Sequence, residues 1–231
     1  MKTTTALVTG SSKGIGKAIA DKFEDEGFNV IRNGKSNSNH KNYVKADIGI
    51  KNEVLKIKKY ISDNFSGLDI LVNNAAYTKF IQHDNLNGLS EGLMNKILDT
   101  NVKGPIYCTQ VFEDFLKISP EGQIINIASI AGITGQGSNI MYCASKSALI
   151  TLTKSLAKSL APIRVNSISP GFIETGFVKF PDGYNEKTIQ KTPLNRSGQP
   201  VDIANVAWGL VQSKFITGEN IVVDGGLILW I

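Results

Sequence analysis

The sequence predicts a single α/β domain built on a three-layer, doubly wound parallel sheet of about seven strands. Short apolar runs alternate with stretches of helical periodicity along the whole chain, which is the pattern of parallel strands joined by crossover helices. The apolar run at residues 123–128 suits a strand that is buried on both faces. A glycine-rich turn joins the first run to the first helical stretch, at a position where such sheets bind ligands.

The individual elements follow from these runs. Strands are predicted at residues 6–8, 29–32, 43–44, 69–72, 123–128, 164–168 and 220–224. Helices are predicted at residues 15–23, 54–61, 94–98 with a continuation after Gly104-Pro105, 140–160 and 201–211. Only about ten residues, Asn33–Asn42, separate the second strand from the third, whereas a parallel crossover normally takes a dozen or more residues and a helix. We therefore predict a shortened connection without a full helix, and a more open sheet edge.

Composition narrows the classes of protein to which the chain can belong. Its 231 residues suit one domain spanning residues 1–231, and 42% hydrophobic and 19% charged residues are ordinary for a soluble globular protein. No apolar run reaches transmembrane length and the N-terminus lacks a signal-peptide core, so we expect a cytoplasmic protein with no membrane partner. Two cysteines and two histidines are too few for a metal site or a disulfide framework. The net charge of +5 is spread along the chain, without an arginine-rich run that would indicate nucleic-acid binding.

The turn after the first strand reads Thr9-Gly10-Ser11-Ser12-Lys13-Gly14-Ile15-Gly16. Its glycines allow a tight turn and a close approach of the backbone to a ligand. The helix that follows offers free N–H groups and the positive end of its dipole to a pyrophosphate. The strand–turn–helix context favours a dinucleotide site over a plain turn. The predicted contacts are Gly10, Ser12, Lys13, Gly14, Ile15 and Gly16.

Two side chains in the long helical stretch indicate proton transfer. Tyr142 and Lys146 lie four residues apart, which places them on one face of a helix. A neighbouring ammonium favours phenolate, so we predict that Lys146 lowers the pKa of Tyr142 from its free value of about 10. Such a phenol can exchange a proton with a substrate hydroxyl or carbonyl. Ser129 follows the fifth strand, where it can hydrogen-bond the same substrate oxygen.

Several motifs together resemble the short-chain dehydrogenase/reductase family over essentially the full chain. The glycine spacing Gly-x-x-x-Gly-x-Gly, the Tyr142-x-x-x-Lys146 pair and Asn73-Asn74-Ala75-Ala76 look like that family's motifs, although an alanine replaces the last residue of its Asn-Asn-Ala-Gly segment. Further matches are Pro170-Gly171, Thr217-Gly218 and Asp224-Gly225-Gly226. The resemblance implies a Rossmann fold and an oxidoreductase that moves a hydride between a nicotinamide cofactor and a carbonyl–alcohol pair.

The same resemblance implies a role for each site residue. Asn101, Ser129, Tyr142 and Lys146 match the family's catalytic tetrad in order and spacing. Lys146 would also hold the nicotinamide ribose, and Asn101 would fix a water that relays protons to Lys146. The implied cofactor contacts beyond the glycine turn are Asp47 and Ile48 at the adenine, Asn74 and Ala75 along the cofactor, Pro170 and Gly171, and Ile173 and Thr175 near the carboxamide.

The residues near the second strand bear on which nicotinamide cofactor is used. Enzymes that use NAD typically place an acidic residue about twenty positions beyond the glycine turn, yet no carboxylate occurs between Glu26 and Asp47. Arg32 or Lys35, with Lys13, could neutralise a 2′-phosphate. We therefore predict NADP(H) rather than NAD(H); the alternative is that these basic groups simply face water.

The residues after the sixth strand resemble the family's mobile substrate lid, at about residues 171–199. Aromatic and apolar side chains there either line a partly apolar pocket or pack the lid down: Phe172, Phe177, Val178, Phe180 and Tyr184. Family members of this length commonly reduce 3-oxoacyl thioesters, while others oxidise sugar, polyol or steroid alcohols, some with NAD. They usually form a homotetramer or dimer through the helices near residues 102–116 and 140–160. The remaining alternatives are a non-catalytic redox sensor that binds a dinucleotide, and a lyase or epimerase that uses the same tyrosine.

Overall fold

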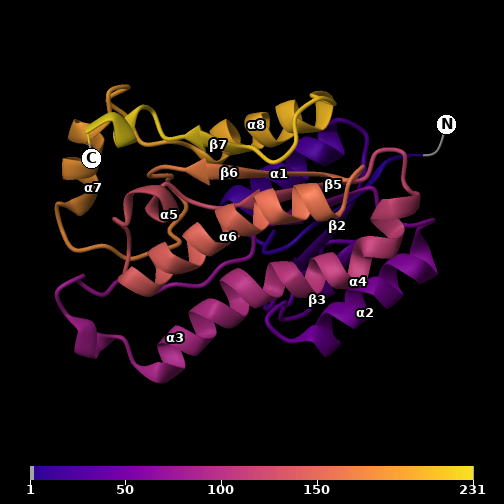
Figure 1. Cartoon of the computed structure of the whole chain (residues 1–231), viewed down its shortest axis with the longest axis horizontal. Helices are drawn as coiled ribbons and strands as arrows, with labels where there is room; N and C mark the ends of the chain where they lie inside the picture. The colour runs from indigo at the N-terminus through magenta and orange to yellow at the C-terminus, as the bar shows by residue number, and fades with distance from the viewer. Residues whose placement is uncertain (1–2, 231) are drawn as a thin grey trace.

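A computed structural model describes residues 3–230, and its seven strands form one parallel sheet in the order β3-β2-β1-β4-β5-β6-β7 (Figure 1). The strands are β1 Thr5–Val8, β2 Asn29–Gly34, β3 Tyr43–Lys45, β4 Ile70–Asn73, β5 Gln123–Ile127, β6 Arg164–Pro170 and β7 Asn220–Val223. The predicted single-domain, doubly wound fold is confirmed. Residues 1, 2 and 231 of the predicted domain span lie outside the described residues.

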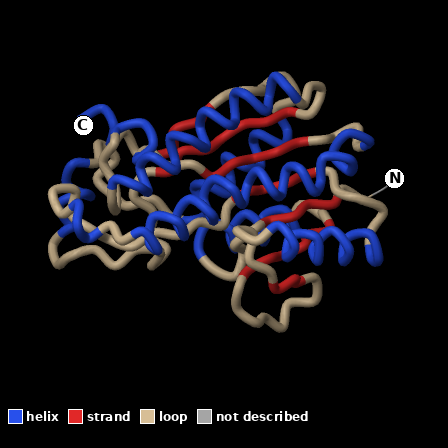
Figure 2. Tube along the Cα trace, turned by 60° about the horizontal axis from the view of Figure 1, so that its bottom comes forward, coloured by secondary structure: helices blue, strands red, loops and turns tan. Residues whose placement is uncertain are grey.

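Helices cover both faces of the sheet, which makes the three layers seen edge-on in Figure 2. One face packs against α2 (Lys51–Asn64), α4 (Gly104–Ile118) and α6 (Ile140–Ser159), and the other against α1 (Gly14–Asp25) and α8 (Pro200–Gln212). Strand β4 shows why its run is continuously apolar. Leu71 belongs to the first core, while Ile70 and Val72 belong to the second, because successive side chains point to opposite faces.

The connection between β2 and β3 contains no helix, as predicted. An ion-pair cluster covers the α1 side of β2 instead. The Arg32 guanidinium, only 5% exposed, donates to Asp21 at 2.6 Å and to Glu24 at 2.7 Å, both on α1. His40 of the connection lies 3.4 Å from Glu24. These ion pairs therefore cover the part of the sheet that a crossover helix would otherwise cover with apolar side chains.

The helical region after β4 is more continuous than its Gly-Pro pair suggests. The helix α3 (Glu91–Leu98) passes through a single π-helical stretch, Asp99–Lys103, directly into α4. Pro105 follows directly in the first turn of α4, and the π-helical stretch lies where the missing N–H of proline interrupts the α-helical hydrogen bonds. Two helices that the periodicity did not predict are α5 (Ala131–Thr134) and α7 (Tyr184–Lys191), and short 3₁₀ turns occupy Leu86–Gly88 and Leu227–Trp230.

The strand order reverses at β1, which has β2 on one side and β4 on the other. Connections leaving β1 and β4 therefore diverge to opposite faces of the sheet, and a crevice is left at the carboxyl ends of the two strands. This edge carries the glycine turn after β1, the Asn74-Ala75 segment after β4 and Ser129 after β5.

Candidate active site

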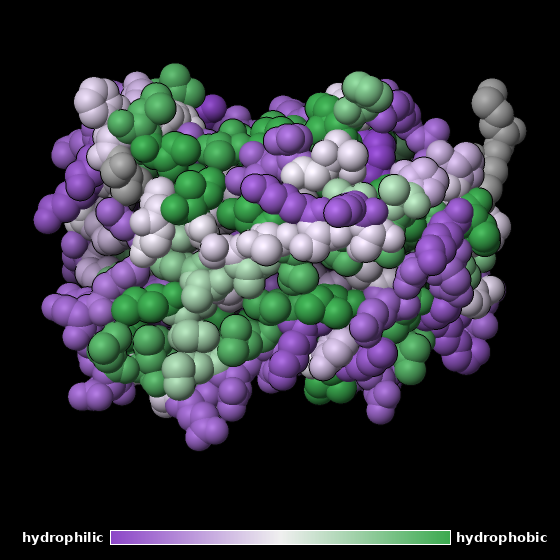
Figure 3. All heavy atoms as spheres, in the orientation of Figure 1, coloured by the Kyte–Doolittle hydropathy of each residue, from purple (hydrophilic) through white to green (hydrophobic). Residues whose placement is uncertain are grey.

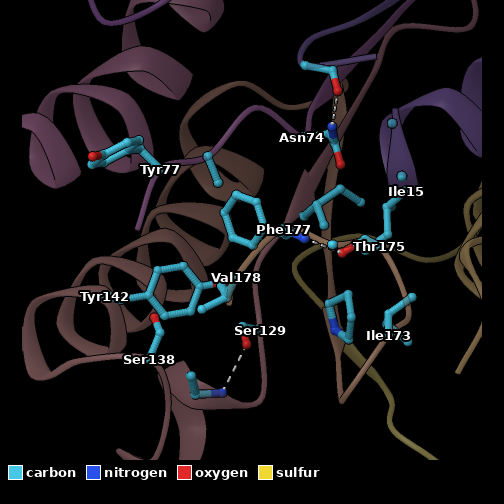
Figure 4. A pocket seen from close by; sticks show the side chains of 18 of the residues that line it. Ile15, Asn74, Tyr77, Ser129, Ser138, Tyr142, Ile173, Thr175, Phe177 and Val178 are labelled. Carbon is cyan, nitrogen blue, oxygen red and sulfur yellow. Dashed lines mark hydrogen bonds between the residues drawn. The ribbon is translucent and has the colours of Figure 1, made fainter. Parts of the chain in front are cut away.

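A cavity of about 890 Å³ opens at this carboxyl edge (Figure 4). Arg32 and Asn101 are the predicted site residues that do not line it. The others do: Gly10, Ser12, Lys13, Gly14, Ile15, Gly16, Lys35, Asp47, Ile48, Asn74, Ala75, Ser129, Tyr142, Lys146, Pro170, Gly171, Ile173 and Thr175. These residues, between positions 10 and 175 of the sequence, come from the ends of six strands and from the start of α6, and they surround one space.

The glycine turn is held open by close backbone packing. A Cβ on Gly16 would lie 2.3 Å from Asn74 Nδ2, and one on Gly10, whose φ is +63°, would lie 2.7 Å from Ala75 Cα. Asn74 Nδ2 donates to Thr9 O at 2.8 Å and to Gly10 O at 3.1 Å, which fixes the turn against the end of β4. The start of α1 therefore faces the cavity without a side chain in the way, and these residues fit a pyrophosphate.

The two hydroxyls predicted to act on the substrate come together at the other end of the cavity. Figure 4 shows Tyr142, Ser129 and Ser138 on one side of the space, with Ile173 and Thr175 across from them. The Ser129 side chain acts on the Tyr142 phenol and lowers its pKa, so the two hydroxyls lie near each other. Ser129 Oγ also accepts from Ala131 N at 3.1 Å, which orients the hydroxyl at the start of α5. Both groups can therefore address one oxygen atom.

Lys146 lies behind Tyr142 on the same face of α6. Its side chain is 2% exposed, and Nζ donates to Ile127 O at 2.6 Å. The ammonium lies 5.8 Å from the centre of the Tyr142 ring. A lysine has three donors, so the bond to Ile127 leaves two for a ligand in the cavity.

The prediction that Lys146 lowers the pKa of Tyr142 is wrong for the chain without a ligand. Burial raises the pKa of Tyr142 to about 12, although the neighbouring Ser129 side chain acts in the opposite direction. Burial also lowers the pKa of Lys146 to about 7. A buried lysine is partly neutral near pH 7 and provides little charge to stabilise a phenolate. Tyr142 consequently stands as a protonated phenol, which is the form that donates a proton.

Asn101 lies in the π-helical stretch, away from the cavity wall, and its side chain is 1% exposed. Its Nδ2 donates to Tyr77 O and to Ser145 Oγ, both at 3.0 Å, while Oδ1 accepts from Tyr77 N at 2.8 Å. The amide therefore joins the loop after β4 to α6. These contacts give the side chain a positioning role, and both of its donors are already used.

The prediction for Arg32 is not supported, because its guanidinium points into the α1 layer. Val30 and Arg32 alternate with Ile31 along β2, and the even positions face α1. Lys35 does reach the cavity, and its Nζ donates to Asp47 at 2.8 Å. This ion pair lowers the pKa of Asp47 against the effect of burial, with help from the Gly49 N–H. Lys35 and Lys13 remain as the basic groups near the end of β2 that line the cavity.

The aromatic and apolar residues of the predicted lid both line the cavity and pack against one another. Phe172, Phe177, Val178, Phe180 and Tyr184 line the cavity. Phe180 also stacks on Tyr184 with ring centres 4.3 Å apart, and Phe80 of the loop after β4 meets both rings edge-on. Phe177 lies 6.4 Å from Tyr142, measured between ring centres. The end of the cavity beside Tyr142 is therefore strongly aromatic.

Sequence reasoning missed one residue that places Tyr142. Asn139 is the N-cap of α6: its Oδ1 accepts from Tyr142 N at 2.7 Å. Its Nδ2 donates to Thr78 Oγ1 at 2.9 Å and to Lys79 O at 2.8 Å. An Asn directly before an apolar helical run is an N-cap signature, so the signal was present. Lys187, Thr188 and Lys191 of α7 also line the cavity, and no sequence pattern had singled them out.

Within residues 3–230, no helix is long and apolar enough to span a membrane. The same residues hold no group of three or more His, Cys, Asp or Glu side chains that could bind a metal ion.

Comparison with known proteins assigns the class. Residues 10–228 match a family model described as enoyl-(acyl carrier protein) reductase. A putative ketoacyl reductase of the granaticin polyketide synthase from Streptomyces violaceoruber is 34% identical, with 96% of this chain and 94% of the relative covered. A 3-oxoacyl-(acyl-carrier-protein) reductase from Staphylococcus aureus is 36% identical, with 98% and 99% covered.

Solved structures agree with this assignment. A putative short-chain dehydrogenase/reductase from Burkholderia xenovorans superimposes with a TM-score of 0.91 at 29% identity, covering 99% of each chain. The ligand-free aldohexose dehydrogenase of Thermoplasma acidophilum gives 0.88 at 29% identity, covering 99% of this chain and 95% of that one. The chain belongs to the short-chain dehydrogenase/reductase family. It is an oxidoreductase that acts on CH–OH groups.

Proposed function

We propose that the protein reduces a 3-oxoacyl thioester to the 3-hydroxyacyl thioester with NADPH. The observation that supports this most directly is the convergence of Ser129, Tyr142 and Lys146 on a cavity that begins at the glycine turn. Two curated relatives at 34% and 36% identity carry ketoacyl or 3-oxoacyl reductase names, which supports the substrate class.

The chain's own residues would divide the work as follows. The glycine turn and the start of α1 would bind the pyrophosphate, and Lys146 Nζ would donate to the nicotinamide ribose hydroxyls. The bound cofactor supplies a hydride to the carbonyl carbon. Ser129 Oγ would hydrogen-bond the carbonyl oxygen, and Tyr142 would give its phenolic proton to that oxygen as it becomes an alcohol. A phenol whose pKa burial raises to about 12 keeps that proton at neutral pH.

The preference for NADP(H) rests on a smaller set of residues than the sequence suggested. Lys35, Lys13 and Ser36 line the cavity at the end of β2, and Arg32 does not. A 2′-phosphate would compete with Asp47 for Lys35, whose side chain is 52% exposed. No acidic residue occupies residues 27–46, so no carboxylate of this segment would repel the phosphate.

The alternative is oxidation of a sugar or polyol alcohol with NAD, which the structural similarity to an aldohexose dehydrogenase favours. Two assays at the absorbance band of the reduced cofactor separate them: ketones and 3-oxoacyl thioesters are tested with NADPH and NADH, and sugars and polyols are tested with NADP+ and NAD+. Reduction of a 3-oxoacyl thioester with NADPH is expected. Turnover confined to sugars and NAD would replace the proposal with the alternative. Dinucleotide binding without any turnover would favour the redox sensor, and product formation without cofactor consumption a lyase or epimerase.

We also propose a cytoplasmic homotetramer or dimer. Figure 3 shows apolar surface over the face where α3, α4 and α6 lie in Figure 1, bordered by hydrophilic groups. Ile118 at the end of α4 is 78% exposed, and Ile140 at the start of α6 is 38% exposed. Burying such surface between copies would stabilise an oligomer. Light scattering of the purified protein distinguishes a monomer from a dimer or tetramer.

A further inference from the structure

A second, smaller cavity opens beside the substrate end of the main one. This side groove has a volume of about 470 Å³ and is lined by Thr78, Lys79, Phe80, Phe177, Val178, Lys179 and Pro181. It shares Phe177 and Val178 with the main cavity. The ring centre of Phe177 is 6.4 Å from that of Tyr142, so the groove adjoins the end of the main cavity that holds the phenol.

The walls of the side groove combine apolar surface with positive charge. Both charged residues that line it are lysines, Lys79 and Lys179, and both are exposed. Among the described residues neither ammonium has a carboxylate partner, and the nearby lid carboxylates Asp182 and Glu186 form no ion pair with them. Two lysines without carboxylate partners, at the rim of an apolar groove, suit a ligand with a long neutral chain and a terminal phosphate. The chain would contact the apolar side chains and the phosphate would pair with the ammonium groups.

The groove is also fixed relative to Tyr142. Asn139 Nδ2 donates to Lys79 O at 2.8 Å, while Oδ1 of the same side chain caps the backbone of Tyr142 at 2.7 Å. Thr78 and Ser138 are joined through their hydroxyls at 2.6 Å. Phe80, which follows Lys79, packs edge-on against Phe180, which follows Lys179. This contact joins the two segments that carry the lysines. Both lysines are therefore carried by segments that are tied to the site of proton transfer.

We propose that the side groove holds the phosphate-bearing arm of the thioester substrate, with Lys79 and Lys179 pairing with that phosphate. The inference rests on the proposed thioester reduction and adds the residues that recognise the carrier. Two sources share this chemistry, namely free coenzyme A thioesters and thioesters on the phosphopantetheine arm of a carrier protein. A ketone that bears its own carboxylate is the competing occupant of a groove lined by lysines.

Two substrates that differ only by the phosphate test the proposal: 3-oxobutanoyl pantetheine and its 4′-phosphate. The ratio of kcat/KM for the phosphorylated over the unphosphorylated ester is measured for the wild type, for the double variant Lys79→Ala/Lys179→Ala, and for Lys214→Ala. Lys214 pairs with Glu121 near the amino ends of the strands, away from the groove, and serves as the control for the loss of a surface lysine. We expect the ratio to fall about five- to thirtyfold in the double variant, through KM, and to stay unchanged in the control.

The other outcomes separate this proposal from the proposed function. An unchanged ratio, or an equal loss on both esters, would overturn the phosphate site while leaving thioester reduction in place. If the wild type reduces simple ketones but neither ester, the phosphate site and the thioester class both fall and the reductase remains. The double variant is then assayed with the coenzyme A and carrier-protein esters. A fall in kcat/KM for either ester supports the proposal. The ester whose kcat/KM falls more identifies the carrier.

Discussion

At the scale of single residues, burial sets the protonation state of Tyr142, the proton donor in the proposed reduction. Burial raises its pKa to about 12, so the group is a phenol at neutral pH and is ready to donate rather than to accept a proton. Tyr142→Phe removes the donor but keeps the ring that faces Phe177. We expect turnover of a ketone to fall about 10²- to 10⁴-fold, the scale of general acid catalysis, with little change in cofactor affinity.

Steady-state kinetics and cofactor fluorescence titration measure both quantities. The control is Tyr107→Phe, which changes a phenol on α4 that does not line the cavity. Turnover within a few-fold of the wild type in Tyr142→Phe would show that the proton comes from another group.

Lys35 carries the prediction about cofactor choice, since Arg32 is committed to Asp21 and Glu24. Lys35→Ala should raise KM for NADPH about tenfold and leave KM for NADH nearly unchanged, because only the 2′-phosphate loses a cation. Lys41→Ala removes a charge from the same connection at a position that does not line the cavity, and should change neither value. A parallel rise in both Michaelis constants for Lys35→Ala would indicate that the change disturbs the pocket rather than phosphate recognition.

At the scale of secondary-structure elements, the short helix α5 is pressed against α6 at the level of Lys146. A Cβ on Gly132 would lie 2.6 Å from both Lys146 C and Ser147 N, which are backbone atoms that cannot rotate away. Gly132→Ala should therefore push the two helices apart, at a cost of about 1–3 kcal/mol in the free energy of unfolding. Because Ser129 lies just before α5, the variant should also lose activity.

Urea unfolding and turnover, measured on the same preparation, test this prediction. Gly209→Ala is the matched control, because Gly209 lies exposed in α8 with open space around it, and alanine is the better helix former. It should leave stability unchanged or raise it by up to about 1 kcal/mol. Equal stability of Gly132→Ala and the wild type would mean that α5 can shift without cost.

The elements that the sequence could predict are those with a core-facing pattern. The seven strands have apolar runs and the helices that pack on the sheet have apolar periodicity, so the sequence predicted their order and approximate bounds. Helix α7 was not, because Tyr184 and Ile189 are its only apolar residues and neither is fully buried. The four residues of α5 are too few for any periodicity, and the π-helical stretch shifts the pattern by one position without interrupting it.

The candidate site divides in the same way. Motif spacing was sufficient to bring Ser129, Tyr142 and Lys146 to the glycine turn, because each motif follows a strand or begins a helix at one edge of the sheet. Spacing says nothing of burial, and burial is what reversed the expected shift in the pKa of Tyr142. Arg32 was predicted to bind the cofactor. Side chains alternate along a strand, so Arg32 lies on the same face of β2 as Val30, which packs against α1.

At the scale of the whole molecule, the fold buries several titratable groups whose pKa values differ from those in the unfolded chain. Lys146 is 2% exposed with a pKa lowered to about 7 by burial, and Cys108 is fully buried with a pKa raised to about 12 by burial. Tyr142 shifts in the same direction as Cys108. Buried groups of this kind make the stability of the fold depend on pH through the protons that folding releases or retains.

The sign of this dependence can be worked out for Lys146. Below about pH 7 the lysine is charged in both states, and the folded chain bears the full cost of burying that charge. Between pH 7 and the ordinary lysine value of about 10.4, the unfolded chain binds a proton that the folded chain does not, so the free energy of unfolding rises with pH. Cys108 acts oppositely from about pH 8 and Tyr142 from about pH 9, where the unfolded chain begins to lose protons that the folded chain keeps.

Between pH 7 and 9 Lys146 therefore makes the larger contribution in the chain without cofactor, and a variant at this position separates it from that of Cys108. Raising the pH across this window should stabilise the wild type by up to about 2–3 kcal/mol, at about 1.4 kcal/mol for each unit. Lys146→Met, which keeps the length of the side chain without its titrating group, should lack this gain. Urea unfolding of both proteins at pH 7, 8 and 9 gives the comparison, and the difference between them removes the contribution of every other group. Parallel curves for the two proteins would mean that Lys146 keeps its proton in the folded chain, and that its ammonium is available to Tyr142 before any cofactor binds.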